Sequence, residues 1–589
     1  MRLQFLRGAI LFGVVAVALT EALGAFDLLR PWVVRIAWLA LLSAGLRFVI
    51  SRRTKRRFAT KDPVNLFGIG SVLAIVALVA CTAWFSAPNT YDVIAYHMPR
   101  VVYWAQAGNV AFFPANYLHQ NLMPPFAEYI FLHLYLISGG DRLVNMVQAA
   151  ALLGCAIGVS AAARELGAGL RGQVLAAVAV VTIPAAVLEA SGAKNDVVLS
   201  FWLIAAVCFA LRYTRTLAAV DAAGLGFSLA LALFTKGTAL ILSAPILIAA
   251  LAPIVRRHWK KIPVVLCIVA LCVTLVNAPF YARYFRETGG HFASFGLNND
   301  TPSLRAAVSN ALRNGATELG SANAPWDRAI YRLIAATHRK LGIPLNDPAT
   351  TYWGCAFGIP QRSTHEALAT NLAHTLLLIA AFFPLAWYLR RNPCWMTLYA
   401  GIFAAFVLFG AVLKYQQYHP RLLLPLYGVG CILIGVLAEF LLPRWGQALP
   451  IVFLLWVASP YAFENYLRPL MGSYSVLRTP RDESYLSEIR FLGMVPQYKE
   501  AVRLVRESGC VRVGIDYVAS ALEYPLQALV LETNARARFF HARMQQEDPC
   551  IVVCFDCAGN AEKEERYKDF DRAALPPIVV YKIRHAVSY

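Results

Sequence analysis

Repeated apolar runs of about 18 to 22 residues constrain the fold of this chain more than any other feature of its sequence. Each run is long enough to cross the hydrocarbon core of a bilayer as a helix. Of the 589 residues, 58% are hydrophobic and only 15% are charged, whereas a soluble chain of this length needs far more charge to cover its surface. The sequence therefore predicts a polytopic helical membrane protein.

Short basic clusters between the apolar runs predict the orientation. The net charge of +20 includes dense clusters at 52–57, 256–261 and 390–391, which all fall on one side of the membrane in our assignment, the cytoplasmic side. This placement argues against nucleic-acid binding, because no soluble basic domain carries the charge. We place about thirteen spans, near residues 7–24, 31–50, 65–85, 142–162, 172–190, 196–214, 219–234, 238–254, 262–280, 371–389, 395–413, 421–441 and 449–465.

Two long connections and a C-terminal segment remain outside these spans. Residues 1–469 are expected to form the membrane module, with a first outer loop at 86–141 and a long outer loop at 281–370. Pro99 to Trp104 opens an amphipathic stretch, which predicts helices along the membrane surface. Residues 470–589 predict a small extracytoplasmic α/β domain with buried strands at 511–516, 550–554 and 578–583.

The N-terminal run and four cysteines each allow two interpretations. Arg2 and Arg7 precede the first run, which we take as a retained span rather than a signal peptide; cleavage would leave the later topology unchanged. In an extracytoplasmic domain, one or two disulfides are favoured over a zinc site, although the connectivity does not follow from the sequence. The cysteines concerned are Cys510, Cys550, Cys554 and Cys557.

Ionisable residues gather at the outer ends of the spans. The stretch from Tyr91 to Arg100 places a carboxylate, an imidazole and a guanidinium close together at the mouth of a span. Few ionisable residues lie in mid-span, where a transporter or a proton pump needs them. The sequence therefore predicts chemistry at the outer membrane surface. The outer residues are Asp92, His97, Arg100, Glu128, Asp196, Lys236, Lys414, His419 and Arg421.

This residue set suits glycosyl transfer from a lipid phosphate. A carboxylate can take the proton from an acceptor hydroxyl while that hydroxyl attacks the anomeric carbon. The leaving group is already a phosphate, so it needs cations rather than a general acid, and Lys and Arg are suited to hold it.

Each residue also has a simpler interpretation. Asp92 and Asp196 could cap the helices that follow them, and Lys236 and Arg421 could be interfacial anchors. The histidines could be surface residues that only form hydrogen bonds. Glu128, which follows two prolines, could be a solvated acid at a helix start.

Five motifs in order resemble a known family. They are Asp92-x-x-x-Tyr96-His97-Met98-Pro99-Arg100, Pro124-Pro125-x-x-Glu128, Lys194-Asn195-Asp196, Thr235-Lys236-Gly237-Thr238 and His419-Pro420-Arg421-Leu422-Leu423-Leu424-Pro425. Together they resemble the membrane-embedded GT-C glycosyltransferases over most of residues 65–440. The nearest match is the family 39-like branch with the protein O-mannosyltransferases and the RgtA/B/C/D-like lipopolysaccharide-core transferases; the lipid A aminoarabinose transferase is a more distant relative.

The resemblance implies roles for these residues. Asp92 would be the catalytic carboxylate and Asp196 a second acid, while Lys236 and Arg421, with Arg100 and His419, would contact the donor phosphate. The further candidates are His97, Tyr96, Glu128 and Lys414. The donor would be a polyprenyl-phosphate sugar, the acceptor a lipid, a glycan or a protein, and the stereochemistry inverted.

One departure from the family pattern affects the acceptor and the metal. Protein O-mannosyltransferases carry two adjacent acids in the first loop, whereas Val93 follows Asp92 here. This weakens the protein-acceptor interpretation, and without a tight carboxylate cluster we expect no obligatory metal or other cofactor.

The expected protein is thus an inverting glycosyltransferase of the bacterial cytoplasmic membrane, active on its outer face. Three alternatives stay open. They are a polysaccharide polymerase or ligase with a pyrophosphate-linked donor, a transporter of lipid-linked substrates, and an inactive scaffold that displays the C-terminal domain.

Overall fold

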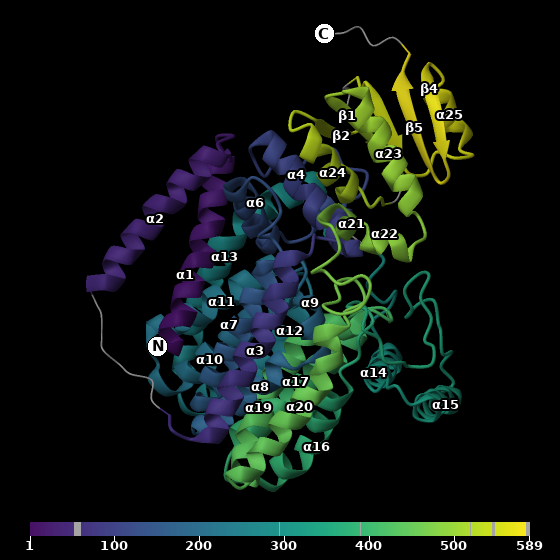
Figure 1. The fold of residues 1–589 in the computed structure, drawn as a ribbon. Coiled ribbons are helices and arrows are strands. Elements are labelled where there is room, and N and C mark those ends of the chain that lie inside the picture. The colour runs from purple at the N-terminus through teal and green to yellow at the C-terminus, as the bar shows by residue number, and fades with distance from the viewer. Residues whose placement is uncertain are drawn as a thin grey trace.

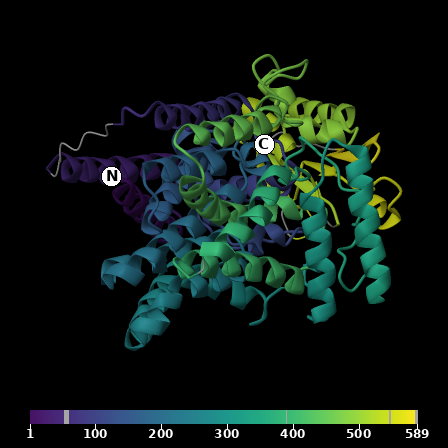
Figure 2. The ribbon, with the colours of Figure 1, turned by 90° about the horizontal axis from the view of Figure 1, so that it is seen from below.

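The computed structural model describes residues 1–51, 60–293, 295–388, 390–518, 520–542, 544 and 548–584. The basic cluster expected at 52–57 lies outside the described residues. The chain forms a bundle of long helices, and a small sheet with its own helices covers one end of the bundle (Figure 1). Seen from below, the helices of the long outer loop stand beside the bundle (Figure 2).

Apolar helices occupy all thirteen of the expected spans. Within the described ranges, nine helices are long and apolar enough to cross a membrane, and the other spans coincide with shorter apolar helices. The predicted polytopic helical fold is therefore confirmed. The bundle helices are α1 (Arg2–Gly24), α2 (Pro31–Ser51), α3 (Pro63–Phe85), α7 (Met146–Glu165), α8 (Leu170–Val181), α9 (Pro184–Glu189), α10 (Asp196–Thr216), α11 (Ala219–Thr235), α12 (Ala239–Arg257), α13 (Ile262–Glu287), α16 (Leu372–Tyr388), α17 (Pro393–Val412), α19 (Leu424–Leu441) and α20 (Ala448–Phe463).

The span expected at 172–190 is broken in the middle. Helix α8 ends at Val181, and α9 restarts at Pro184, which has no N–H to continue the ladder of hydrogen bonds. The break leaves α9 as a short, fully buried helix that ends at Glu189. It therefore places a carboxylate close to the Lys194-Asn195-Asp196 motif that begins α10.

The first outer loop contains the expected helices, and its amphipathic stretch packs against protein. Its elements are the π-helix η1 (Val93–His97), α4 (Met98–Ala107), α5 (His119–Leu122) and α6 (Phe126–Ser138). The first seven residues of α4 are all buried. Helix α4 packs between α6 and the C-terminal elements α24 and β2. The aromatic residues Tyr103 and Trp104 of this stretch are buried within the protein, so the expectation that they are interfacial was wrong, whereas the placement of these helices along the membrane surface stays a prediction.

The long outer loop carries two amphipathic helices, α14 (Leu304–Glu318) and α15 (Ala324–Leu341). Their starts are capped by Ser303 and Asn323, whose side chains accept hydrogen bonds from backbone N–H groups of the first turn. Helix α14 packs along α17 of the bundle. Short helices complete the membrane module: η2 (Trp259–Lys261), α18 (His419–Leu422) and η3 (Trp445–Gln447).

The C-terminal segment folds around a five-stranded mixed sheet of order β2-β1-β3-β5-β4. Strand β1 pairs in parallel with β2 and β3, and β5 pairs antiparallel with β3 and β4. The predicted α/β fold is confirmed. Its elements are α21 (Arg481–Tyr485), α22 (Ser487–Phe491), α23 (Val495–Ser508), β1 (Arg512–Asp516), α24 (Tyr524–Thr533), β2 (Arg538–His541), β3 (Ile551–Cys554), α25 (Ala561–Arg566), β4 (Phe570–Leu575) and β5 (Ile578–Ile583).

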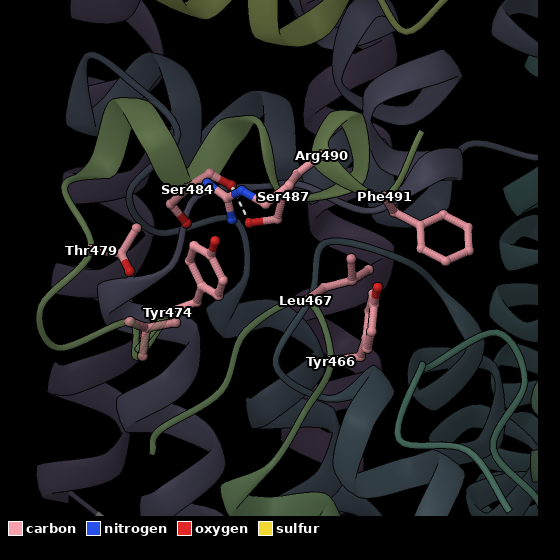
Figure 3. Close-up of a pocket in the computed structure, with 9 residues that line it drawn as sticks. Tyr466, Leu467, Tyr474, Thr479, Ser484, Ser487, Arg490 and Phe491 are labelled. Carbon is pink, nitrogen blue, oxygen red and sulfur yellow. Dashed lines mark hydrogen bonds between the residues drawn. The ribbon is translucent and has the colours of Figure 1, made fainter. Parts of the chain in front are cut away.

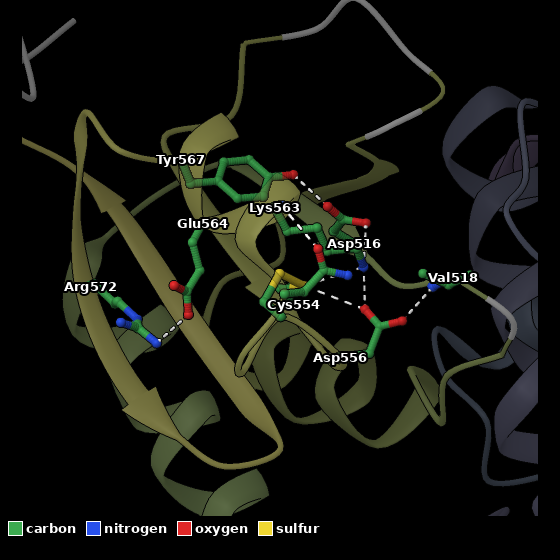
Figure 4. The surroundings of a disulfide bond; sticks show 10 residues. Asp516, Val518, Cys554, Asp556, Lys563, Glu564, Tyr567 and Arg572 are labelled. Carbon is green, nitrogen blue, oxygen red and sulfur yellow. Dashed lines mark hydrogen bonds and ion pairs between the residues drawn. A yellow bond between two sulfur atoms is a disulfide. The ribbon is translucent and has the colours of Figure 1, made fainter.

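The four C-terminal cysteines form two disulfides, Cys510–Cys550 and Cys554–Cys557. Asp516 lies close enough to the second pair to suggest a metal site. However, the ammonium of Lys563 lies 3.3 Å from Asp516 and also pairs with Asp556 (Figure 4). A built-in cation thus already neutralises these acids, and the disulfide interpretation agrees with the structure.

Asp141 connects the first outer loop to the C-terminal segment. Its carboxylate is buried, pairs with Arg481 at 2.6 Å and accepts hydrogen bonds from Tyr485 at 2.8 Å and Tyr524 at 2.6 Å. Three donors from one side of the interface thus converge on one acid from the other side. Such a buried acid is well satisfied only while the two parts remain docked.

Replacing Asp141 with Ala should loosen this interface. The change leaves a partly buried guanidinium and two buried hydroxyls without their acceptor, which costs roughly 2–4 kcal/mol. We expect a lower midpoint of thermal unfolding in detergent, followed by intrinsic fluorescence, and faster proteolysis near residues 464–480. Asp300→Ala, at an ion-paired but 61% exposed carboxylate, is the matched control. Unfolding of Asp141→Ala at the wild-type temperature would contradict this assignment.

Candidate active site

An ion pair between Asp92 and Arg421 forms the centre of the candidate site. Asp92 precedes the π-helix η1, and Arg421 comes from α18, which is 329 residues further along the chain. The Arg421 Nη1 atom lies 2.5 Å from Asp92 Oδ2. The Asp92 carboxylate makes no capping hydrogen bond to η1. The helix-cap interpretation is therefore not what the structure adopts.

The charges around Asp92 keep it ionised. Burial alone would raise the pKa of Asp92, but Arg421, Lys194 and His97 together hold that pKa well below its usual range. Burial likewise opposes the charge of Arg421, yet Asp92, Asp196 and Glu189 raise the pKa of its guanidinium. Both groups are therefore charged at neutral pH, and their side chains are only 21% and 14% exposed.

A second ion pair adjoins the first. Asp196 is the first residue of α10, and its Oδ1 atom lies 2.6 Å from the Nζ atom of Lys236, which follows α11. The other carboxylate oxygen of Asp196 is buried and has no hydrogen-bond partner within the described ranges. Asp196 also acts electrostatically on Arg421. The structure therefore brings together the four residues that the sequence placed first, Asp92, Asp196, Lys236 and Arg421.

Lys194 links this centre to acids that sequence reasoning missed. Its Nζ atom lies 3.2 Å from Glu189 and 2.5 Å from Glu366, and Glu366 also pairs with the buried Arg468. Burial opposes ionisation of Glu366, but Arg468 and Lys194 lower its pKa to about 2. The only available signal was Glu189, an acid at the end of an apolar run. Glu366 and Arg468 lie in separate loops without any local pattern.

His97, Arg100 and Glu128 form a buried group behind Asp92. The His97 Nδ1 atom lies 2.9 Å from Glu128 Oε1, and Arg100 Nη1 lies 3.3 Å from the same oxygen. Arg100 also donates to the backbone carbonyls of His119 and Gln120. The ring of Tyr96 packs on His97 with centroids 4.1 Å apart. Because all three guanidinium nitrogens of Arg100 have acceptors within the loop, its geometry suits loop positioning better than phosphate binding.

Two other candidates differ in their relation to the centre. His419 is buried, and its Nδ1 atom lies 2.9 Å from Asn314 Oδ1. Burial, assisted by Arg313 and Arg421, lowers the pKa of His419 to about 3, so the ring is neutral and offers no charge to a phosphate. Lys414 pairs at 2.7 Å with Asp300, whose carboxylate is 61% exposed. Lys414 therefore interacts with the long outer loop and not with Asp92.

A cavity of about 200 Å³ lies outside this centre. Figure 3 shows Tyr466, Tyr474, Phe491 and Arg490 around it. Asn89 joins its wall to the Arg468–Glu366 pair, because its amide nitrogen donates to the carbonyls of Leu467 and Ser484 and its amide oxygen accepts from Arg468 Nη1 at 2.8 Å. The cavity contains none of the ionised side chains described above.

Glu366→Gln should destabilise the protein, because it removes the charge that compensates both Arg468 and Lys194. Breaking one partner from a buried ion pair costs about 3–5 kcal/mol. The measurement is the midpoint of thermal unfolding in detergent. The double variant Glu366→Gln/Arg468→Met should recover part of the loss, since it removes the uncompensated guanidinium as well. A double variant that is as unstable as the sum of the two single variants would show that the two side chains are not coupled.

The comparisons with known proteins agree with this architecture. No family model matches the sequence, and neither does any curated protein. Among solved structures, ArnT from Cupriavidus metallidurans bound to undecaprenyl phosphate superposes with a TM-score of 0.51 at 14% identity, over 87% of this chain and 97% of that chain. Its apo structure gives a TM-score of 0.49 at 14% identity, over the same shares. The chain therefore has the GT-C fold that the sequence motifs predicted.

Proposed function

We propose that this protein is an inverting glycosyltransferase that moves a sugar from a polyprenyl-phosphate donor to an acceptor hydroxyl. One observation carries the proposal. Two carboxylates, Asp92 and Asp196, meet the cations Arg421 and Lys236 in a single partly buried cluster at the ends of membrane helices. A proton acceptor beside several fixed cations is the set of groups that this reaction needs.

A lipid-linked donor fits both the fold and the charges. The ArnT structure with the same fold is bound to undecaprenyl phosphate, so this fold can hold a polyprenyl phosphate. In our chain, the planar guanidinium of Arg421 suits a phosphate group, and the ammonium of Lys236 supplies a second positive charge. Lys194 adds a third cation nearby, which acts on Asp92 electrostatically.

The chemical step involves one proton and two bonds to the anomeric carbon. Asp92 takes the proton of the acceptor hydroxyl while the hydroxyl oxygen bonds to the anomeric carbon. The bond between that carbon and the phosphate oxygen breaks, and its electron pair leaves with the polyprenyl phosphate. Attack opposite to the leaving group inverts the stereochemistry. Arg421 and Lys236 stabilise the charge that develops on the phosphate.

Arg421 also controls when Asp92 becomes basic. In the ligand-free protein the guanidinium holds the pKa of Asp92 well below its usual range, which makes Asp92 a weak base. A donor phosphate competes for the same guanidinium. When Arg421 turns to the phosphate, Asp92 loses its strongest cationic partner, and its affinity for a proton rises. Donor binding would therefore activate the base.

The remaining parts of the proposal concern place and partners. We place the reaction on the outer face of a bacterial cytoplasmic membrane, with the acceptor a lipid, a glycan or a protein. The positive-inside pattern of the basic clusters supports this orientation. The carboxylates of the centre already have ammonium or guanidinium partners, so we propose that no metal is obligatory.

Asp92→Asn should abolish turnover while donor binding persists. The amide keeps the shape of the side chain but cannot take a proton, so we expect the rate to fall by about 10²–10⁴-fold. The assay offers purified protein a panel of polyprenyl-phosphate sugars with lipopolysaccharide and peptide extracts, and follows release of free polyprenyl phosphate. Asp300→Asn, at the exposed carboxylate, should keep wild-type turnover. Full turnover by Asp92→Asn would exclude this mechanism.

Arg421→Lys should impair donor use although the positive charge remains. A lysine lacks the planar fork that matches a phosphate and also releases the fixed contact with Asp92. We expect kcat/KM for the donor to fall by about 10–100-fold, through a lower kcat as well as a higher KM. Arg444→Lys makes the same substitution at an arginine whose side chain is 51% exposed, and it should leave the kinetics unchanged. Wild-type donor kinetics in Arg421→Lys would show that Arg421 does not contact the phosphate.

A further inference from the structure

Glu523 is an acid in the C-terminal domain that receives hydrogen bonds from both sides of the domain interface. It is completely buried and lies immediately before α24. Two donors come from its own domain: Tyr517 at 2.9 Å and Gln527 at 3.2 Å. Two come from the first outer loop: the hydroxyl of Tyr103 at 2.7 Å and the side-chain amide of Gln120. The acid thus connects the domain to the loop that carries Asp92.

Gln120 extends this connection to the turn beside Asp92. Its side-chain nitrogen donates both to Glu523 and, at 3.0 Å, to the backbone carbonyl of Ala95. The same nitrogen lies 3.4 Å from the hydroxyl of Tyr517. Ala95 lies in the π-helix η1, three residues after Asp92. The backbone carbonyl of Gln120 accepts a hydrogen bond from Arg100, so both the backbone and the side chain of Gln120 stabilise the loop.

The π-helix η1 is the kind of element that needs such support. A π-helical turn is wider than an α-helical turn, occurs rarely and is found often at functional sites. The start of η1 determines where the Asp92 carboxylate lies relative to Arg421, which comes from a separate helix. A displacement of about 1 Å in a catalytic group can reduce the rate by roughly 100-fold. A fixed acceptor for Gln120 therefore has a direct consequence for Asp92.

We propose that Glu523 of the C-terminal domain is a positioning residue for catalysis, which holds the Asp92 turn in place through Gln120. This inference rests on the proposed function, in which Asp92 is the base. It assigns a role to the C-terminal domain for which the sequence offered no motif. The domain would be a structural part of the catalytic loop.

The ionisation of Glu523 gives the link a pH dependence. Burial raises the pKa of Glu523 to about 7, against the effect of the hydrogen bonds from Tyr103, Gln120 and Tyr517. Among the titratable side chains near Glu523, His541 of β2 lies 3.9 Å away, and burial lowers the pKa of His541 to about 3, so this ring is neutral. The phenols of Tyr103, Tyr498 and Tyr517 are neutral as well, because burial raises their pKa well above the usual value.

The sign of this dependence follows from the raised pKa. Four donors point at the acid. Above pH 7 the carboxylate can accept a hydrogen bond from each of them, whereas the protonated acid carries an O–H donor that competes with these four. Positioning should therefore weaken as the pH falls through about 7. The stability of the fold follows the opposite trend. The contribution of Glu523 to stability is fully present below the unfolded pKa and is lost as the pH rises through the folded pKa.

A double-mutant cycle tests the link. The variants are Glu523→Ala, Gln120→Leu and their combination, assayed at pH 8 with the donor that the wild type uses. Each single variant should lower kcat by about 10–100-fold and leave the donor KM within about 3-fold. The double variant should be no slower than the slower single variant, because both changes break the same link. Losses that multiply would overturn the proposal.

Tyr103→Phe is the matched control for this cycle. It removes a hydrogen bond to the same acid across the same interface, but in the part of the chain that the structure describes the hydroxyl of Tyr103 donates to Glu523 and not to η1. Its kcat should stay within about 2-fold of the wild type. Glu523→Gln keeps the volume of the side chain and removes its charge. In this variant kcat should no longer change as the pH passes through about 7. An unchanged pH profile in Glu523→Gln would overturn the role assigned to this acid.

Hydrogen exchange separates this proposal from the proposed function. Amide exchange of residues 93–98, followed by mass spectrometry in detergent, should be faster in Glu523→Ala and Gln120→Leu than in the wild type or Tyr103→Phe. If no donor is turned over by the wild type, the proposed function fails, and the exchange still tests the link. Exchange at the wild-type rate in both variants would overturn the link even if the enzyme is a glycosyltransferase.

Discussion

The contact between Asp92 and Arg421 is the interaction on which the candidate site depends. Charged groups taken out of water are tolerated when they are paired, and removal of one partner leaves a costly orphan. Within the described residues, each carboxyl group of this site contacts at least one cation. The carboxylates Asp92, Asp196, Glu189 and Glu366 are matched by the cations Arg421, Lys236, Lys194 and Arg468. An incoming phosphate therefore has to take a cation from a carboxylate, and Arg421 is the cation whose release also changes Asp92.

Much of the fold could be predicted because a bilayer limits the choices. Only helices satisfy their own backbone in lipid, so that each long apolar run predicts one element. The wrong predictions concern features of the fold that the hydrophobic pattern of the sequence does not reveal. Pro184 splits one expected span because it cannot donate the backbone hydrogen bond that would continue the helix. The amphipathic stretch of α4 could face lipid or protein, and the C-terminal domain decides between them by covering it.

The candidate site could be predicted only in part, for the same physical reason. Asp92, Asp196, Lys236 and Arg421 lie at span ends, and a common side of the membrane is enough to suggest that they meet. Glu366 and Arg468 gave no such signal, because their roles arise from contact with Lys194 and with each other. Arg100 shows the opposite case. Its position in the motif suggested a ligand contact, but its guanidinium is used up by Glu128 and two backbone carbonyls.

The first outer loop and the C-terminal domain each contribute one buried acidic side chain to their interface. The loop contributes Asp141, whose donors are Arg481, Tyr485 and Tyr524 of the C-terminal segment. The domain contributes Glu523, and two of its donors come from the loop. Each side therefore buries an acid that only the other side satisfies fully. A buried acid without its donors is expensive, so neither part has its native conformation at low cost without the other. The conformation of the turn that carries Asp92 is consequently a property of both parts together.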